Sequence, residues 1–189
     1  MKIFILASFL ILSSCGPTTT GNPVTAPVTV RMEDQQAFAL IKKAWDSIIP
    51  SAFSTVSNVK FCFKRLRFKP DSNTSGSDFD VNLGEVDINP NGTNLLTVAV
   101  PIGTYRRIEF DLENECDGTP DTPSVTVTNL NGTFTTLDHV TIKFEGSYTV
   151  SQSGTLSLDV DSLFDALDTI ASGNDIKTVL EAETTIGDF

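Results

Sequence analysis

The sequence predicts a mainly β domain, an antiparallel β-sandwich with an amphipathic helix near its start and a short helix near its end. Two observations predict this class. After Ser57, apolar and polar residues alternate in short runs, which is the period of half-buried strands. Turn-forming residues separate these runs, and the helical stretches that a parallel α/β sheet needs between its strands are missing.

The alternation predicts the strands in order. The first begins near residues 29–31. At Lys64 and Arg65 two polar residues follow one another, and this slip in phase predicts a β-bulge inside one strand. Turn sequences occur at 89–92, 131–132 and 151–154. We expect further strands at 59–68, 79–88, 95–100, 105–112, 125–130, 140–144, 148–150 and 156–160.

Helical spacing appears at both ends of the β region. Over residues 34–49 an apolar stripe runs through Phe38, Ile41, Trp45 and Ile48. We expect this helix to cover one face or an open end of a sheet. The alternative is a helix on a membrane surface, but that would require a strongly basic polar face, and this face is mixed.

A second helical pattern lies near the end of the chain, with Asp161 placed to cap it. Its apolar positions are Leu163, Phe164, Leu167 and Ile170.

The N-terminus has the form of an export signal. Lys2 precedes an apolar run over 3–12, which covers only about half of a bilayer span. The run ends in Leu12-Ser13-Ser14-Cys15. This string resembles the lipobox of bacterial lipoproteins, and the resemblance implies cleavage before Cys15 and a diacylglyceryl group on its sulfur. The alternative is an ordinary secretory signal followed by a chance cysteine.

These features divide the chain into three parts. Residues 1–14 form the expected signal peptide, residues 15–28 the lipidated cysteine and a flexible Pro- and Thr-rich tether, and residues 29–189 a single domain. Gly16 stands where the inner-membrane retention signal of enterobacterial lipoproteins has Asp. That resemblance favours the outer membrane of the cell envelope and leaves open whether the domain faces the periplasm or the cell surface.

The negative net charge restricts the classes of binding partner. The net charge of −11 includes Lys2, so removing residues 1–14 leaves −12. Such an acidic body argues against binding nucleic acid and against an electrostatic hold on anionic lipid. It suits a soluble domain held near a negatively charged membrane by its anchor.

Two cysteines remain once Cys15 carries lipid. Cys62 and Cys116 form an even pair in an exported protein, which predicts a disulfide. Closing a loop of about 55 residues would stabilise the fold by about 4 kcal/mol in the chain-entropy description. The alternative is two free buried thiols.

One segment carries a resemblance to known sandwiches. Residues 101–105, Pro-Ile-Gly-Thr-Tyr, followed by an alternating strand to Leu112, resemble the Pro-x-Gly-x-Tyr signature of prealbumin-like and carboxypeptidase-regulatory-like exported domains. The resemblance implies a Greek-key, prealbumin-like sandwich. We expect Tyr105 to pack its ring while its hydroxyl reaches the backbone. The stretch from Val59 to about Leu180 is similar to bacterial lipoproteins of unknown function, through residues 59–68, 103–112 and 156–161.

Residues 87–92 fit the first six positions of a calcium-loop pattern, so Asp87, Asn89 and Asn91 are candidate cation ligands. The twelfth position is Val98 in place of a bidentate Glu, which excludes an EF-hand. The two interpretations left are an irregular calcium site and a plain hairpin turn. No other cofactor is expected.

Basic residues gather on two expected strands. One interpretation is a site for an anion such as a lipid headgroup, a sugar acid or a partner's carboxylate. The other, which we favour, is cross-strand pairing with Glu109, Asp111 and other acids. The residues are Lys60, Lys64, Arg65, Arg67, Lys69, Arg106 and Arg107.

Catalytic signals are weak. His139 is the single histidine, it stands beside Asp138, and no Gly-x-Ser-x-Gly sequence accompanies it. The few Trp and Tyr residues argue against an aromatic platform for sugars. The first hypothesis is therefore a non-catalytic envelope protein that binds an envelope protein or a surface glycan. The alternatives are a glycan- or calcium-binding surface module, as in an adhesin, and a hydrolase whose acid residues the sequence does not single out.

Overall fold

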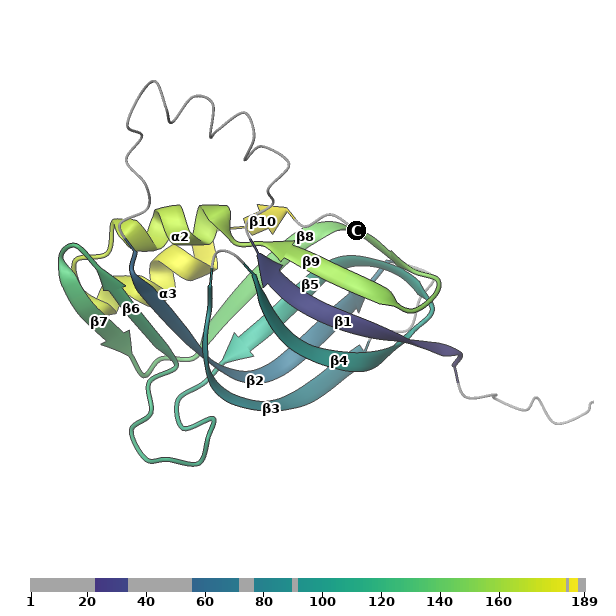
Figure 1. Ribbon diagram of the computed structural model, residues 1–189, viewed down its shortest axis with the longest axis horizontal. Coiled ribbons are helices and arrows are strands. Elements are labelled where there is room, and N and C mark those ends of the chain that lie inside the picture. The colour runs from purple at the N-terminus through teal and green to yellow at the C-terminus, as the bar shows by residue number, and fades with distance from the viewer. Residues whose placement is uncertain (1–22, 34–55, 72–76, 90–91, 183, 187–189) are drawn as a thin grey trace, which may run out of the picture.

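The computed structural model describes residues 23–33, 56–71, 77–89, 92–182 and 184–186, which form mainly β-structure in two facing sheets (Figure 1). The smaller sheet has the order β4-β1-β9, from β4 (Thr93–Pro101), β1 (Thr25–Glu33) and β9 (Gly154–Asp159). The larger has the order β10-β8-β5-β2-β6-β7, with β3 also paired to β2. Its strands are β2 (Asn58–Pro70), β3 (Ser77–Asp87), β5 (Gly103–Leu112), β6 (Val125–Asn129), β7 (Gly132–Thr136), β8 (Val140–Val150) and β10 (Thr184–Ile186).

The core lies between the sheets, and β2 shows why. Phe61 and Phe63 point into the core and are buried. The predicted bulge is confirmed, because the register of β2 against both β3 and β5 shifts between Phe63 and Arg65. The extra residue restores the alternation, so Leu66 and Phe68 again face the core and are fully buried.

Strand β1 begins earlier than the sequence indicated. Residues 25–28, assigned to the tether, already belong to the sheet, because Ala26 and Val28 continue the buried alternation. Pro27 is exposed and precedes Val28, where the pairing with β9 begins. Its missing N–H therefore falls where β1 has a partner on one side only.

The expected all-antiparallel arrangement is wrong in two places. Strand β9 pairs parallel to β1, and β10 pairs parallel to β8. For β9 the reason is geometric. Strand β8 ends at Val150, opposite Gly103, and residues 151–153 carry the chain into the other sheet. Strand β9 therefore leaves the same end of the sandwich as β1 and runs in the same direction.

The turn at residues 89–92 is also not a hairpin turn. It joins β3 of the larger sheet to β4 of the smaller one, so it carries the chain from one sheet to the other. Gly92 has φ +114°, and its N–H donates to the Asn89 carbonyl at 2.9 Å. Glycine reaches this backbone conformation without the strain that a Cβ would cause.

Two helices close one end of the core. α2 (Asp161–Asp168) and α3 (Gly173–Ala182) lie beside the β6–β7 hairpin (Figure 1). Asn129 on β6 donates from Nδ2 to the Leu167 and Ile170 carbonyls at 3.1 and 2.9 Å, which satisfies the C-terminal end of α2.

Three expectations about the helices need comment. Asp161 does not cap α2: Val160 is the N-cap residue, and Asp159 accepts the Asp161 N–H at 2.9 Å. α3 was not predicted, because Ile176 and Leu180 are its only buried residues. The expected helix over 34–49 lies outside the described residues.

Strand β2 exchanges partners along one edge. Residues 58–61 pair with β6 and residues 63–70 pair with β5. At the junction, the Cys62 N–H donates to the Ser124 carbonyl at 2.9 Å, and its carbonyl accepts from Glu113 N at 3.1 Å. The segment 113–124 leaves the sheet at this junction and protrudes from it (Figure 1). We call this segment the acidic loop, since it holds four acidic and no basic residues.

The predicted disulfide is confirmed at this junction. Cys62 bonds Cys116 of the acidic loop, with 5.6 Å between their Cα atoms. The Cys116 N–H also donates to the Cys62 Sγ at 3.2 Å. Cys62 is fully buried although it points away from the core, because the loop folds back over it. The disulfide therefore holds together the point where β5 and β6 separate.

Replacing both cysteines tests this role. The Cys62→Ala/Cys116→Ala chain should lose up to about 4 kcal/mol in its free energy of unfolding, because the unfolded chain regains the freedom of the open loop. Urea unfolding measures it. The reduced wild-type chain is the control, since it lacks the bond but keeps both side chains. A loss below about 1 kcal/mol in both would contradict the proposed role.

Candidate functional site

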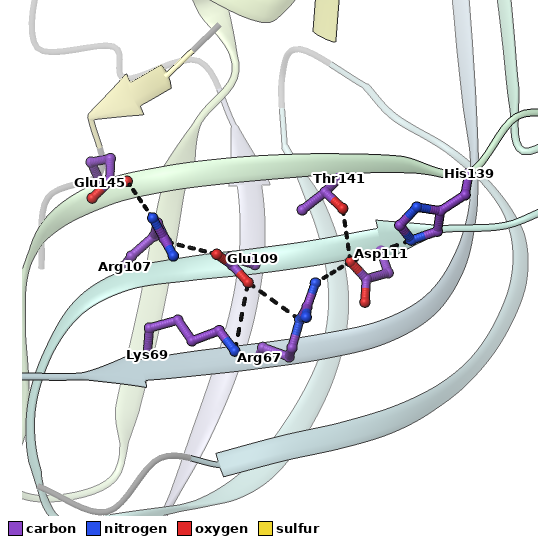
Figure 2. Close-up of polar contacts among 8 residues, drawn as sticks. All are labelled: Arg67, Lys69, Arg107, Glu109, Asp111, His139, Thr141 and Glu145. Atoms are coloured by element: carbon purple, nitrogen blue, oxygen red, sulfur yellow. Dashed lines mark hydrogen bonds and ion pairs between the residues drawn. The ribbon is translucent and has the colours of Figure 1, made fainter. Parts of the chain in front are cut away.

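The outer face of the larger sheet carries the main polar cluster of the described chain. Because Leu66 and Phe68 face the core, Arg67 and Lys69 point outward, and the same alternation on β5 turns Glu109 outward. Figure 2 shows contacts that run from Glu145 at one side to His139 at the other. We call this cluster the charged ladder; it consists of Arg67, Lys69, Arg107, Glu109, Asp111 and Glu145.

Strand register brings the opposite charges together. Arg67 on β2 stands opposite Glu109 on β5, and Arg107 on β5 stands opposite Glu145 on β8. Directly opposed pairs lie close enough to interact across neighbouring strands. The Arg107 Nη1 donates to Glu145 Oε1 at 3.2 Å.

Glu109 is the centre of the ladder. Its carboxylate lies 2.7 Å from Arg107 Nε, 3.3 Å from Arg67 Nε and 3.8 Å from Lys69 Nζ. The two Nε contacts are ion pairs without hydrogen-bond geometry. Only 6% of the Glu109 side chain is exposed, although it lies on an outer face. The long stems of the three cations cover it while their charged groups stay partly in water.

Asp111 joins the ladder to β8 and to the histidine. It accepts from Arg67 Nη2 and from the Thr141 hydroxyl at 3.0 Å, and its Oδ1 lies 3.6 Å from His139 Nε2. In acyl-transfer enzymes the hydroxyl bonds the imidazole, which the carboxylate holds from its other side. Here the hydroxyl bonds the carboxylate directly. These three residues therefore do not form that catalytic order.

The ladder is electrically balanced. Its three cations, Arg67, Lys69 and Arg107, face three carboxylates, so the six charges sum to zero. The arrangement follows the cross-strand interpretation for Arg67, Lys69 and Arg107, whose charges pair with carboxylates of the protein itself. A site for an external anion stays a prediction for the remaining basic residues.

Those remaining residues are not gathered at one place. Lys60 contacts Glu85 at 3.1 Å, and this hydrogen bond, with the charges of Glu85 and Asp87, raises the pKa of Lys60. Lys64 and Arg65 are exposed at the bulge of β2. Arg106 is exposed where the register between β5 and β8 shifts. Of the seven basic residues named from the sequence, the structure brings Arg67, Lys69 and Arg107 together around Glu109.

The candidate cation ligands lie elsewhere. Asp87 and Asn89 line a pocket of about 240 Å³ together with Val56, Ser57, Asn58, Ile88 and Phe164. Asn58 Nδ2 donates to Asp87 Oδ1 at 3.2 Å, and Lys60 Nζ lies 4.0 Å from the same oxygen. Asn91 lies outside the described residues. Within the described ranges, His, Cys, Asp and Glu form no group of three that could hold a metal ion.

The acidic loop is held by its own backbone. Glu115 and Asp121 have φ of 57° and 64°, and Glu115 N–H donates to the Thr122 carbonyl at 2.9 Å. Asp117 accepts the Thr119 N–H at 2.9 Å, and this hydrogen bond lowers the pKa of Asp117. Its acids therefore have fixed backbone positions at the end of the sandwich near the β6–β7 hairpin.

Known proteins add no further constraint. No family model matches the chain, and neither a curated protein nor a solved structure does. In the part of the chain that the structure describes, no helix is long and apolar enough to cross a membrane. Cys15 and the expected signal peptide lie outside those residues, so export and lipidation stay predictions.

Sequence reasoning missed two members of this site, Thr141 and Glu145 on β8. Thr141 is a polar position of the expected strand 140–144, and Glu145 follows the end of that strand; the structure places both in one longer strand, β8. The missing information was the neighbour of β8: only its pairing with β5 places Thr141 against Asp111 and Glu145 against Arg107. Strand order is not encoded in local alternation.

Removing the central charge tests the ladder. Glu109→Gln keeps the shape of the side chain but leaves three cations without their shared carboxylate. We expect a loss of about 2 kcal/mol in the free energy of unfolding, below the full cost of breaking a buried pair because the cations reach water. Urea unfolding measures it.

Glu145→Gln is the matched control. Glu145 belongs to the same ladder but has a 40% exposed side chain, so its loss should stay below about 0.5 kcal/mol. Equal losses in the two variants would show that Glu109 is not the centre of the network.

Proposed function

We propose that this chain is a non-catalytic, lipid-anchored protein of the bacterial cell envelope, whose sandwich is a binding or structural module. The observation that carries the non-catalytic part is the state of Glu109 and Asp111. Both are almost fully buried acids, and both are occupied by cations of the same sheet. A hydrolase that works through acid residues, the alternative that the sequence leaves open, needs carboxyl groups that face a bound substrate and are free to exchange protons.

The anchored part rests on the lipobox at residues 12–15. Because β1 begins at Thr25, the expected tether is short: nine residues separate Cys15 from the sheet. We place the protein at the outer membrane and name an envelope protein as the partner class, with a surface glycan as the alternative. The finer fold type, a Greek-key or prealbumin-like sandwich with a helix over 34–49, belongs to the same proposal. The bond from the Tyr105 hydroxyl to the Pro101 carbonyl, 2.6 Å, supports the Pro-x-Gly-x-Tyr resemblance.

Two experiments in combination distinguish the binding classes. Crosslinking in living cells should recover an envelope protein with the wild-type chain and lose it with the Cys15→Ala chain, while a glycan array gives no signal. A reproducible glycan signal with no crosslinked protein would favour the surface-glycan module instead.

The anchor has a direct test. Cys15→Ala should abolish incorporation of a labelled fatty acid and move the chain from the membrane to the soluble fraction, because the acylated sulfur is removed. The Cys62→Ala/Cys116→Ala chain is the control and should keep its label. Labelling that persists in Cys15→Ala would refute the lipobox interpretation.

A second candidate function, a calcium-assisted module, is favoured by one observation: Asp87 and Asn89 line the same pocket. Against it, Asn58 and Lys60 already neighbour the Asp87 carboxylate. Our first proposal therefore expects millimolar calcium to leave the thermal midpoint unchanged.

If the chain binds calcium, a calcium concentration of 100 times the dissociation constant would stabilise the fold by about 2.7 kcal/mol. A thermal unfolding scan detects a shift of this size. The calcium site would be established if calcium raised the midpoint of thermal unfolding of the wild-type chain and of Asp117→Asn but not that of Asp87→Asn. Asp117 is the control because it is an exposed acid outside the pocket.

A further inference from the structure

One end of the sandwich brings together three described segments that contain no charged residue, although Lys69, Asp71 and Arg106 lie beside them. Three segments meet there, 23–28, 101–105 and 149–155, and none of them contains Asp, Glu, Lys, Arg or His. Strand pairing joins them: Thr25 pairs with Pro101, Gly103 with Val150, and Val28 with Gly154. We call these three segments the uncharged end; described charged residues such as Asp71 border it.

Two exposed apolar side chains lie together on the uncharged end. Val24 is 71% exposed and Ile102 is 44% exposed. The Ile102 N–H donates to the Val24 carbonyl at 2.9 Å, so the two residues are held side by side. Around them residues 151–155 are exposed, small or uncharged.

The opposite end differs in charge. It carries the β6–β7 hairpin and the acidic loop (Figure 1). It also exposes two apolar residues, Leu130 and Leu137. The acidic loop, with its four acids, joins the same end through Ser124, whose hydroxyl donates to the Asp138 carbonyl at 2.6 Å. The sandwich is therefore polarised along its length.

We propose that the uncharged end rests on the surface of the lipid bilayer, with Val24 and Ile102 in contact with the lipid. This inference rests on the proposed lipid anchor at Cys15 and adds an orientation to it. The occupant of this end is the lipid surface itself.

Chain length supports the orientation. Cys15 and Val24 are nine residues apart, so even a fully extended chain spans only roughly 30 Å. Strand β2 runs between the two ends of the sandwich, from Asn58 beside the β6–β7 hairpin to Pro70 beside Tyr105. Its thirteen residues correspond to about 40 Å. A domain standing on its acidic end would hold Val24 farther from the bilayer than its tether reaches.

Electrostatics supports the same orientation. Bacterial membranes are negatively charged, and the mature chain has a net charge of −12. Contact through the uncharged end places the acidic loop roughly four Debye lengths from the lipid, where salt screens the repulsion. Contact through the uncharged end also removes two exposed apolar side chains from water.

Brominated lipid tests the contact, because it quenches tryptophan only inside the bilayer. The lipidated full-length chain, with Trp45→Phe, is reconstituted into brominated phosphatidylcholine vesicles with either Ile102→Trp or Leu137→Trp. Circular dichroism verifies the fold of both variants, and flotation verifies the anchor. We expect a loss of emission for Ile102→Trp and none for Leu137→Trp.

Every other outcome is informative. If the chain floats with the vesicles but tryptophan emission falls in neither variant, or falls equally in both, the proposed orientation is wrong while the lipid anchor is retained. Ile102→Trp emission shielded from acrylamide but insensitive to bromine would show that a second copy of the chain covers this end, and would overturn it too. A chain that does not float would overturn the anchor and the orientation together.

A measurement on the unsubstituted chain serves as a check. Amide exchange at Ile102 should slow when the lipidated chain sits on vesicles, compared with Cys15→Ala in the same buffer. Exchange at Leu130 should not change. Equal exchange at Ile102 in the two samples would contradict the contact with lipid.

Discussion

Strand β2 forms backbone hydrogen bonds with two different strands along one edge, and the rest of the structure depends on how the chain passes from one partner to the other. Its first residues pair with β6 and its later residues with β5, while β3 follows the other edge. Between the two partners, Cys62 must find separate acceptors and donors for its backbone, and Ser124 and Glu113 provide them. The acidic loop must start and end at this point. The disulfide lies where the partner of β2 changes from β6 to β5, so it restricts the unfolded chain and holds the junction together.

The charged ladder is a consequence of the same strand. The bulge between Phe63 and Arg65 keeps the apolar residues of β2 on the core face, and it thereby turns Arg67 and Lys69 outward against β5. Strand β5 supplies Glu109 and Asp111 at matching positions, and the stems of the cations exclude water from both carboxylates. Charges on an outer face usually contribute little, because water screens them. Here burial makes an unpaired partner costly, so removing one carboxylate destabilises the fold more than removing an exposed charge would.

Features with a local sequence pattern could be predicted from the sequence, whereas features that depend on long-range strand pairing could not. Alternation identified β2 and β5, a break in phase identified the bulge, and cysteine parity identified the disulfide, because each signal lies within a few residues or in the composition. β7 was missed because Thr133, Thr135 and Thr136 leave Phe134 as its single large apolar residue. The parallel pairing of β9 and the change of sheet after Asn89 were missed for another reason. Short connections look alike whether they close a hairpin or cross between sheets.

The polarity of the sandwich connects the fold to its proposed location. The fold places the start of β1, the β4–β5 connection and the β8–β9 connection at one end, and all three are uncharged. It places the acidic loop and the β6–β7 hairpin at the other end. For a chain attached through its N-terminus to a negative surface, the separation lowers the repulsion at the point of contact and turns the acidic loop and the β6–β7 hairpin away from the membrane.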